Sequence, residues 1–381
     1  MNKELYERRI AKVRAQMERL KIDALFLGPS ASLEYLTGER RKKPTYALLL
    51  WTNGWINGAW LTLDKGPIFT APRMVADYEL ENRAGWEVRI LEDVDSSTEF
   101  LRKLGQELGL KGKRIAVEDR AWSSFLIDLL QAVPTAIPVV ASQVMSPVRG
   151  IKGPEEIELL KKACEITDRA FANMVKTLKM GVCELDITHE LESQIRALGS
   201  EPSMTTQVAG LGENYPRTVL DKDNPLRVPI STGTSLDFDF GALYEGYCTD
   251  VGRVVYFGEP TKDFLAAYDA AVASEVAAIE AMKGGAISSE QLYYLAFDVV
   301  DKSGYGQYSP DRLGHGIGMD IHELPFLDKG IPDMLENGMV FCVEPQIIKG
   351  KMVARIEDIV VVTEKGGEHL THMPKELVVI S

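Results

Sequence analysis

The first 145 residues alternate between short apolar runs and amphipathic segments. Near the amino terminus, apolar residues recur at helical spacing and predict a first, amphipathic helix; they are Leu5, Ile10, Val13, Met17 and Leu20. Runs typical of strands follow at residues 23–28, 46–51, 59–63, 67–70, 87–91, 114–117 and 137–141, with helical patterns at residues 100–108 and 121–133. Strands that alternate with helices predict an α/β domain built on a mixed sheet.

Proline and glycine cluster between the two halves of the chain. The stretch MSPVRGIKGP, residues 145–154, contains two of each. Because both residue types interrupt regular structure, this stretch predicts a linker. We therefore expect an amino-terminal domain over residues 1–145, a linker over residues 146–154 and a second domain over residues 155–381.

Longer helical patterns and further strand-like runs fill the second half. Pro154 and two glutamates open a helix that extends to Met180, because proline suits a first helical turn and acids suit the positive end of the helix dipole. Other helices are predicted at residues 184–198, 264–282 and 289–303, and strands at residues 205–209, 235–257, 339–345, 353–362 and 376–380. Antiparallel strands with helices packed against them predict an α+β domain.

The segment 235–257 contains three aspartates within a largely apolar hairpin. At the two-residue period of a strand, Asp237 and Asp239 share one face, and the opposite face is apolar. A turn predicted at residues 245–246 returns Asp250 to the side of Asp239. Buried carboxylates are usually paired, hydrogen-bonded or bound to a metal, because an unpaired buried charge is unfavourable. A solvated sheet face is the alternative interpretation.

Composition narrows the class of protein. The 381 residues are 45% hydrophobic and 26% charged, as in globular proteins. Lysine and arginine number 43 against 56 acids, a net charge of −13 that argues against a nucleic-acid partner. The charged amino terminus lacks the apolar core of a signal peptide, and no apolar run approaches the roughly 20 residues that cross a bilayer. Four widely spaced cysteines predict reduced thiols in a cytoplasmic protein.

Two histidines and two glutamates extend the acidic hairpin into a candidate metal site. His315 lies among three glycines in LGHGIG, and His322 follows seven residues later. Taken alone, such a histidine is also compatible with a structural role. Glu344 ends the run MVFCVEP, and Glu357 lies in VARIED. Two of the hairpin aspartates, one histidine and the two glutamates would form a ligand set of one nitrogen and many oxygens, which suits a pair of Mn, Co, Zn or Fe ions.

In this order and context, the motifs resemble those of the pita-bread metallopeptidases, which include methionine aminopeptidase, aminopeptidase P, prolidase and creatinase. In the proline-specific branch, the ligands are the Asp of D-x-G, an Asp eleven residues later, the His of G-H-G-I-G, the Glu of E-P and the Glu of R-I-E-D. At those places this chain has Asp239, Asp250, His315, Glu344 and Glu357. The resemblance implies an α/β creatinase/prolidase-like amino-terminal domain and an α+β pita-bread catalytic domain.

The resemblance also implies a role for each ligand. Asp239 would chelate one metal, Asp250 and Glu357 would bridge both, and His315 and Glu344 would complete the other. Two divalent metal ions, manganese first and cobalt, zinc or iron as alternatives, would lower the pKa of a bridging water and polarise the scissile carbonyl. The implied activity is hydrolysis of the peptide bond before proline in dipeptides or short peptides.

Three residues would act on the substrate, according to the same resemblance. Glu344 would also carry a proton from water to the leaving nitrogen. His322 would hydrogen-bond the substrate carbonyl and the developing oxyanion. Arg355 would lie near the site and either fork onto a substrate carboxylate or form a structural salt bridge to a ligand acid.

Three positions depart from the family's pattern. Arg217 stands where proline-specific peptidases usually have a histidine that lines the substrate pocket, and an arginine at that place would bind an anionic group. Gly252 replaces a common Thr or Ser. Asp237 adds an acid on the ligand face, either as a solvated or hydrogen-bonded strand residue or as a group that orients or joins the ligands. These departures keep open a hydrolase or lyase that acts on a small, non-peptide zwitterion.

The expected partners are a short peptide or small-molecule substrate and, from the resemblance, a second copy of the chain in a homodimer. Nucleic acid and membranes are not expected. A binding protein that has kept the fold and lost catalysis is a third hypothesis, which the complete ligand set disfavours.

Overall fold

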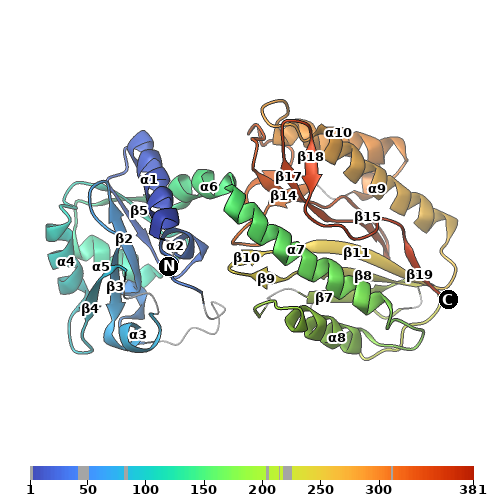
Figure 1. Ribbon diagram of the computed structural model, residues 1–381, viewed down its shortest axis with the longest axis horizontal. Helices are drawn as coiled ribbons and strands as arrows, with labels where there is room; N and C mark the ends of the chain where they lie inside the picture. The colour runs from blue at the N-terminus through green and yellow to red at the C-terminus, as the bar shows by residue number, and fades with distance from the viewer. Residues whose placement is uncertain are drawn as a thin grey trace. The chain divides into compact units, whose positions relative to one another are not determined.

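The chain divides into two compact units, Met1–Arg149 and Gly150–Ser381. The structure, a computed structural model, describes residues 3–41, 51–80, 85–202, 206–213, 215–217, 225–309 and 312–381. Each unit has its own β-sheet core with helices packed around it (Figure 1). Within the described residues, no helix combines the length and apolar character needed to span a bilayer.

A six-stranded sheet in the order β4-β3-β2-β1-β5-β6 forms the first unit. Its strands are β1 (Ala24–Leu27), β2 (Gly58–Thr62), β3 (Ile68–Pro72), β4 (Glu87–Leu91), β5 (Arg114–Val117) and β6 (Ile137–Val140). Strand β1 pairs antiparallel with β2 and parallel with β5, which confirms the predicted mixed sheet. The strand predicted at residues 46–51 lies outside the described residues except for Trp51.

Aromatic packing organises the core of this unit. Its helices are α1 (Lys3–Leu20), α2 (Ala31–Thr37), α3 (Arg73–Tyr78), α4 (Ser97–Glu107), α5 (Ser123–Ala132) and α6 (Ser142–Gly150), with a 3-10 turn, η2 (Gly54–Ile56). The Phe26 ring of β1 stacks on Phe125 of α5 with centroids 3.8 Å apart, and Trp60 of β2 lies 5.0 Å from Phe26. Burial of these large rings attaches α5 to the sheet.

Helix α6 covers the first part of the segment that the sequence predicts as a linker. Pro147 lies inside this helix, where it removes one backbone hydrogen bond. Val144 and Met145 are buried on the same helix, and their burial offsets that loss. Only residues 151–153 separate α6 from the next helix, so the irregular connection is shorter than the expected linker.

Two main sheets and two short ribbons form the second unit. The first sheet, in the order β19-β11-β8-β7, contains β7 (Thr206–Leu211), β8 (Thr234–Phe240), β11 (Val251–Phe257) and β19 (Val378–Ile380). The second, in the order β13-β12-β14-β17-β18, contains β12 (Gly314–Gly316), β13 (Glu323–Leu327), β14 (Val340–Val343), β17 (Asp358–Val362) and β18 (Gly367–His369). The ribbons pair β9 (Leu243–Tyr244) with β10 (Tyr247–Cys248), and β15 (Gln346–Lys349) with β16 (Met352–Arg355).

Helices pack against both sheets of this unit (Figure 1). They are α7 (Pro154–Val175), α8 (Glu184–Ala197), α9 (Lys262–Ala281) and α10 (Ser289–Lys302), with a 3-10 turn, η3 (Gly306–Tyr308). The apolar face of β8 meets α7, where the Phe171 ring lies 5.6 Å from Phe238 and 6.1 Å from Phe240. Apolar side chains of α9 and α10 pack on β14 and β17 of the second sheet. The α+β fold predicted for the second half of the chain is confirmed.

A backbone bridge joins the two sheets beside the predicted ligands. Gly252 of β11 and Glu357 exchange N–H···O bonds of 3.3 and 3.0 Å. A Cβ atom at position 252 would lie 2.8 Å from Arg355 Nε and 3.0 Å from Glu357 Oε2. Glycine therefore lets the strands approach this closely, which accounts for its presence where Thr or Ser is common.

Candidate active site

The β8–β11 hairpin brings two aspartates to one side of the first sheet. Asp239 lies near the end of β8, and Asp250 immediately precedes β11. The turn at residues 245–246 has φ values of 46° and 82°, which is the backbone geometry that a tight hairpin requires. Ligand atoms of Asp239, Asp250 and Glu357 all lie within 4.8 Å of one another. The hairpin therefore folds as predicted, with Asp250 buried and Asp239 partly buried.

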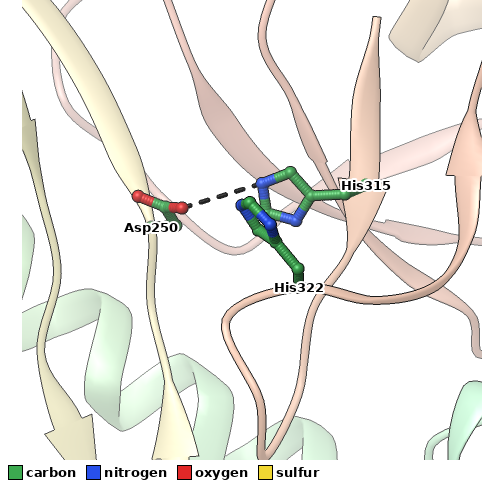
Figure 2. Close-up of side chains that lie close together, drawn as sticks. All are labelled: Asp250, His315 and His322. Atoms are coloured by element: carbon green, nitrogen blue, oxygen red, sulfur yellow. Dashed lines mark ion pairs between the residues drawn. The ribbon is translucent and has the colours of Figure 1, made fainter. Parts of the chain in front are cut away.

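Strand β12 presents His315 to these acids. Glycines on both sides allow the close packing, since a Cβ on the preceding glycine would lie 2.0 Å from a backbone oxygen of β14. His315 Nδ1 is 3.0 Å from the oxygen of the following residue, so Nε2 faces the carboxylates. Nε2 lies 3.6 Å from Asp250, 3.7 Å from Glu344 and 4.0 Å from Glu357. Figure 2 shows Asp250 directed at the His315 ring, with His322 beside it.

Two glutamates complete the cluster from the second sheet. Glu344 follows β14, and Glu357 lies between β16 and β17. As whole residues, Glu344 and Glu357 are 6% and 0% exposed. The structure thus brings together the five residues that the resemblance nominates as metal ligands, which are Asp239, Asp250, His315, Glu344 and Glu357.

Burial alters the protonation of this cluster. Desolvation, reinforced by the charge of Asp239, raises the pKa of Asp250 well above its usual range, and desolvation also raises the pKa of Glu357. Burial lowers the pKa of His315 to about 3, so its imidazole is neutral at pH 7 and Nε2 can act as a metal ligand. Several carboxylates in a dry site are unfavourable unless cations balance them.

The donor set fits divalent metal ions. Asp250 Oδ1 and Glu357 Oε1 are buried, and no residue that the structure describes donates a hydrogen bond to either. A buried polar atom left unsatisfied costs about 1–3 kcal/mol, and a coordinated cation would remove that penalty. One imidazole nitrogen among several carboxylate oxygens suits Mn, Fe, Co or Zn.

His322 lies on the open side of the cluster. Its ring centroid is 4.0 Å from that of His315, and its side chain is exposed. Partial burial, followed by the charge of Arg312, lowers the pKa of His322, so the ring is neutral at pH 7 and has one N–H to offer a substrate. The next residue, Glu323, anchors the loop through two backbone N–H groups and a buried ion pair of 3.0 Å with Lys152. The loop is held firmly while the His322 ring stays accessible to a substrate.

Arg355 forms ion pairs with acids of the cluster. Its guanidinium bonds to Asp239 and Glu357 and lies 3.4 Å from Glu344. The side chain is 6% exposed. Of the two roles predicted for Arg355, the structure shows the salt bridge to ligand acids, and the fork onto a substrate carboxylate is disfavoured because both terminal nitrogens already contact carboxylates.

Arg217 forms a buried ion pair with Glu184 of α8. Its Nε donates to Glu184 Oε1 at 3.0 Å, its Nη2 donates to Oε2, and both side chains are 0% exposed. The same carboxylate accepts backbone N–H groups from Gly210 and Leu226, each at 2.6 Å. The sequence suggests Arg217 as a substrate-binding residue, but its charge is neutralised inside the protein. Breaking such a buried pair is strongly unfavourable, so recruitment of Arg217 by a substrate anion is disfavoured.

Asp237 lies on the ligand face of β8 and is 1% exposed, which corrects its interpretation as a solvated residue. Its charge acts on Arg355: desolvation opposes the charged guanidinium, but Glu357, Asp239 and Asp237 together raise the pKa of Arg355. An orienting role for Asp237 toward the ligands stays a prediction.

Sequence reasoning missed two residues of the site. Arg312 Nη2 donates to Glu344 Oε1 at 3.0 Å. The Cys342 thiol lies within 4.8 Å of ligand atoms of His315 and Glu357. The sequence contains a signal for each of the two residues. Arg312 precedes His315 by three residues, and Cys342 shares a strand face with Glu344.

Comparison with known proteins agrees with this geometry. Residues 158–364 match metallopeptidase family M24, and residues 9–151 match the creatinase/prolidase N-terminal domain. The uncharacterized peptidase YqhT of Bacillus subtilis (strain 168) is 28% identical over 379 residues, which cover 98% of this chain and 100% of that relative.

Solved structures of related enzymes share the fold over nearly the whole chain. The Xaa-Pro dipeptidase from Bacillus anthracis is 27% identical with a TM-score of 0.84, covering 98% of this chain and 100% of that one. The prolidase from Thermococcus sibiricus is 29% identical with a TM-score of 0.86, covering 98% and 99%. The M24 match spans more than half of the chain and includes all five clustered residues that the resemblance nominates as metal ligands. The chain therefore belongs to metallopeptidase family M24, a family of metal-dependent hydrolases, and combines a creatinase/prolidase N-terminal domain with a pita-bread catalytic domain.

Proposed function

We propose that this chain is a dinuclear metal-dependent Xaa-Pro peptidase that hydrolyses the peptide bond before proline in dipeptides or short peptides. The observation that carries the proposal is the convergence of four carboxylates with His315 Nε2, and the position of His322 on the open side of that cluster. Similarity to a solved Xaa-Pro dipeptidase and a solved prolidase supports the choice of bond.

Two divalent ions, manganese first and cobalt, zinc or iron as alternatives, would be held by Asp239, Asp250, His315, Glu344 and Glu357. When bound, such ions activate water and polarise the scissile carbonyl. Asp250 and Glu357 are suited to hold metal, because each has a buried oxygen that accepts no hydrogen bond from a described residue. Arg355 stays beside them and offsets part of the negative charge.

Glu344 and His322 would carry out the proton transfer and the charge stabilisation. Glu344 lies between His315 and Arg312, and its side chain is 8% exposed. Its carboxylate takes a proton from the attacking water and delivers that proton to the leaving nitrogen. His322 donates an N–H to the substrate carbonyl as negative charge develops on its oxygen.

The alternative, a hydrolase or lyase that acts on a small non-peptide zwitterion, has less support than the peptidase. Arg217, which suggested an anionic substrate, is paired with Glu184. Gly252 is explained by the close approach of two strands. Asp237 is the remaining departure, and its burial next to other acids does not favour a zwitterion over a peptide.

A metal-reloading assay tests the proposal. The purified protein, stripped of metal and reloaded with Mn, Co, Zn or Fe(II), should release proline from Xaa-Pro dipeptides or short Xaa-Pro peptides. Glu344→Ala and His322→Ala should each lower kcat/KM by about 100-fold or more. His189→Ala, at an exposed position on α8, is the matched control. No proline release with any metal, or turnover of a betaine-like compound in its place, would refute the proposal.

We also propose a cytoplasmic homodimer, on the basis of the resemblance and of the wide spacing of the four cysteines in the sequence. Sedimentation velocity at micromolar concentration should give twice the mass of the chain. A monomer at that concentration contradicts the dimer and leaves the peptidase proposal intact.

A further inference from the structure

Three arginines of the second unit differ in exposure. The side chains of Arg217 and Arg355 are 0% and 6% exposed, whereas that of Arg312 is 35% exposed. The first two neutralise buried acids. Arg312 contacts the same catalytic cluster from a position that solvent, and therefore a substrate, can reach.

Arg312 is held on one side and open on the other. Its Nη2 donates to Glu344 Oε1 at 3.0 Å, and its guanidinium lies over the Phe326 ring at 5.4 Å. A guanidinium has five N–H donors, and Nε and Nη1 of Arg312 donate to no residue that the structure describes. A planar fork with donors to spare suits two oxygens of one carboxylate.

The contact with Glu344 places Arg312 next to the leaving group. Under the proposed function, Glu344 delivers its proton to the nitrogen of the departing residue. When that residue is the last of the peptide, its carboxylate carbon is two bonds from the nitrogen, about 2.5 Å away. A guanidinium bonded to Glu344 at 3.0 Å is therefore close enough to meet that carboxylate.

Phe326 adds an apolar surface at the same place. It pairs with His315 across β12 and β13, so the two side chains lie on one face of the sheet. The Phe326 ring is partly exposed. It supports the Arg312 guanidinium and offers a surface on which a pyrrolidine ring can pack.

We propose that Arg312 binds the C-terminal carboxylate of the substrate and thereby selects dipeptides that end in a free carboxylate. This inference rests on the proposed function for its assignment of the leaving-group side. A longer peptide places a neutral amide at the same point, and an amide oxygen cannot accept the charged fork that two carboxylate oxygens accept. Substrate length is then set by a charge at the site rather than by a steric stop.

Paired substrates separate recognition from positioning. In the metal-loaded protein, Ala-Pro should exceed Ala-Pro-amide in kcat/KM by about 10- to 100-fold. Arg312→Met should lower kcat/KM for the acid about tenfold more than for the amide, and Arg312→Lys should recover part of the loss because it retains the charge. Arg196→Met, which removes a surface arginine 3.2 Å from Glu192, is the matched control. Equal losses on both substrates would show that Arg312 acts only through Glu344, and would overturn the inference.

A binding measurement keeps this inference distinct from the proposed function. Calorimetry on the metal-loaded variants compares Kd for L-proline with Kd for L-prolinamide. Selective weakening of L-proline in Arg312→Met supports carboxylate recognition, even if no Xaa-Pro peptide is cleaved, a result that would sink the proposed function alone. L-proline binding that is unchanged in Arg312→Met overturns the inference whatever the activity.

Discussion

His315 and His322 lie ring to ring, 4.0 Å apart, yet their surroundings give them different chemistry. His315 is 1% exposed, and its Nε2 faces three carboxylates. His322 is exposed on the far side of that ring. Spacing along the chain cannot show this difference, because burial depends on strands that come from elsewhere in the sequence.

Substitution of the two histidines should therefore separate metal retention from catalysis. His315→Ala removes the nitrogen ligand and should lower metal content as well as activity. His322→Ala should retain the metal content of the parent and lose about 100-fold in kcat, because it removes a donor to the developing oxyanion. Plasma mass spectrometry of the reloaded variants measures metal, and the proline-release assay measures kcat. Equal metal loss in both variants would contradict the assignment.

Ionisation of Asp168, on α7, should make the free energy of unfolding depend on pH. Desolvation raises its pKa to about 6 from 3.8, although the backbone N–H of His372 donates to it at 2.9 Å. Because the pKa of Asp168 is higher in the folded state than in the unfolded state, the folded state holds the proton more tightly. The resulting stabilisation of the folded state is fully present below about pH 4 and is lost as the pH rises through about 6. Asp168→Asn cannot ionise, so it should raise Tm at about pH 7.5 and change it little at about pH 4.

Thermal unfolding followed by circular dichroism at the two pH values measures this difference. Asp298→Asn on α10, whose side chain is 65% exposed, is the control. An equal rise in Tm at both pH values would show that the effect of Asp168→Asn does not come from ionisation.

At the scale of elements, the periodicity of a strand predicts which of its faces packs into the core. The alternation in β8 places Phe238 against α7 and Asp239 on the opposite face, because one face must pack and the other carries the acids. Partners that are distant in sequence are invisible to such a pattern. Arg217 finds Glu184 across 33 residues, and Arg355 finds Asp239 across 116. For the same reason, Pro147 suggested a break in the chain, but tertiary burial of its neighbours maintains α6.

Arg253 is the element-scale link between β11, the strand after Glu357 and the carboxyl-terminal segment. All of its N–H donors have acceptors, and it is 2% exposed. The acceptors are Pro374 O at 3.0 Å, Gly252 O and Glu357 O at 2.8 Å each, Asp358 Oδ1 at 2.6 Å and Met373 O at 3.0 Å. Through the backbone oxygen of Glu357, Arg253 holds a residue of the proposed metal site in place.

Arg253→Lys should therefore lower both stability and metal affinity. Lysine keeps the charge but cannot span acceptors on three segments, so several buried carbonyls lose their donor. The expected loss in free energy of unfolding is roughly 2–4 kcal/mol, from urea titration of the metal-free protein. Metal titration should show weaker binding, because the backbone oxygen of Glu357 loses its hydrogen bond from Arg253. A variant as stable as the parent would refute this role, and a stability loss without any change in metal Kd would limit Arg253 to a structural role.

For the whole molecule, each unit has a hydrophobic core of its own. Composition and alternation suffice to predict an α/β unit followed by an α+β unit, since each rests on local periods. The convergence of the five proposed ligands is not predictable from local periodicity, because they come from separate strands. It was predicted from the motif resemblance alone. All five proposed ligands lie in the second unit, so metal binding should act on that unit.

Metal removal should therefore shift one unfolding transition and leave the other in place. Two units with separate cores are expected to give two calorimetric transitions, of which the second unit's depends on metal. Metal at 100 times its Kd stabilises the binding unit by about 2.7 kcal/mol. For a unit of this size, that corresponds to a Tm shift of about 5–10 °C on adding chelator. Differential scanning calorimetry with manganese and with EDTA measures both transitions. Asp250→Asn should make the second unit's transition insensitive to chelator, and a chelator shift of both transitions by the same amount would mean that the two units unfold together.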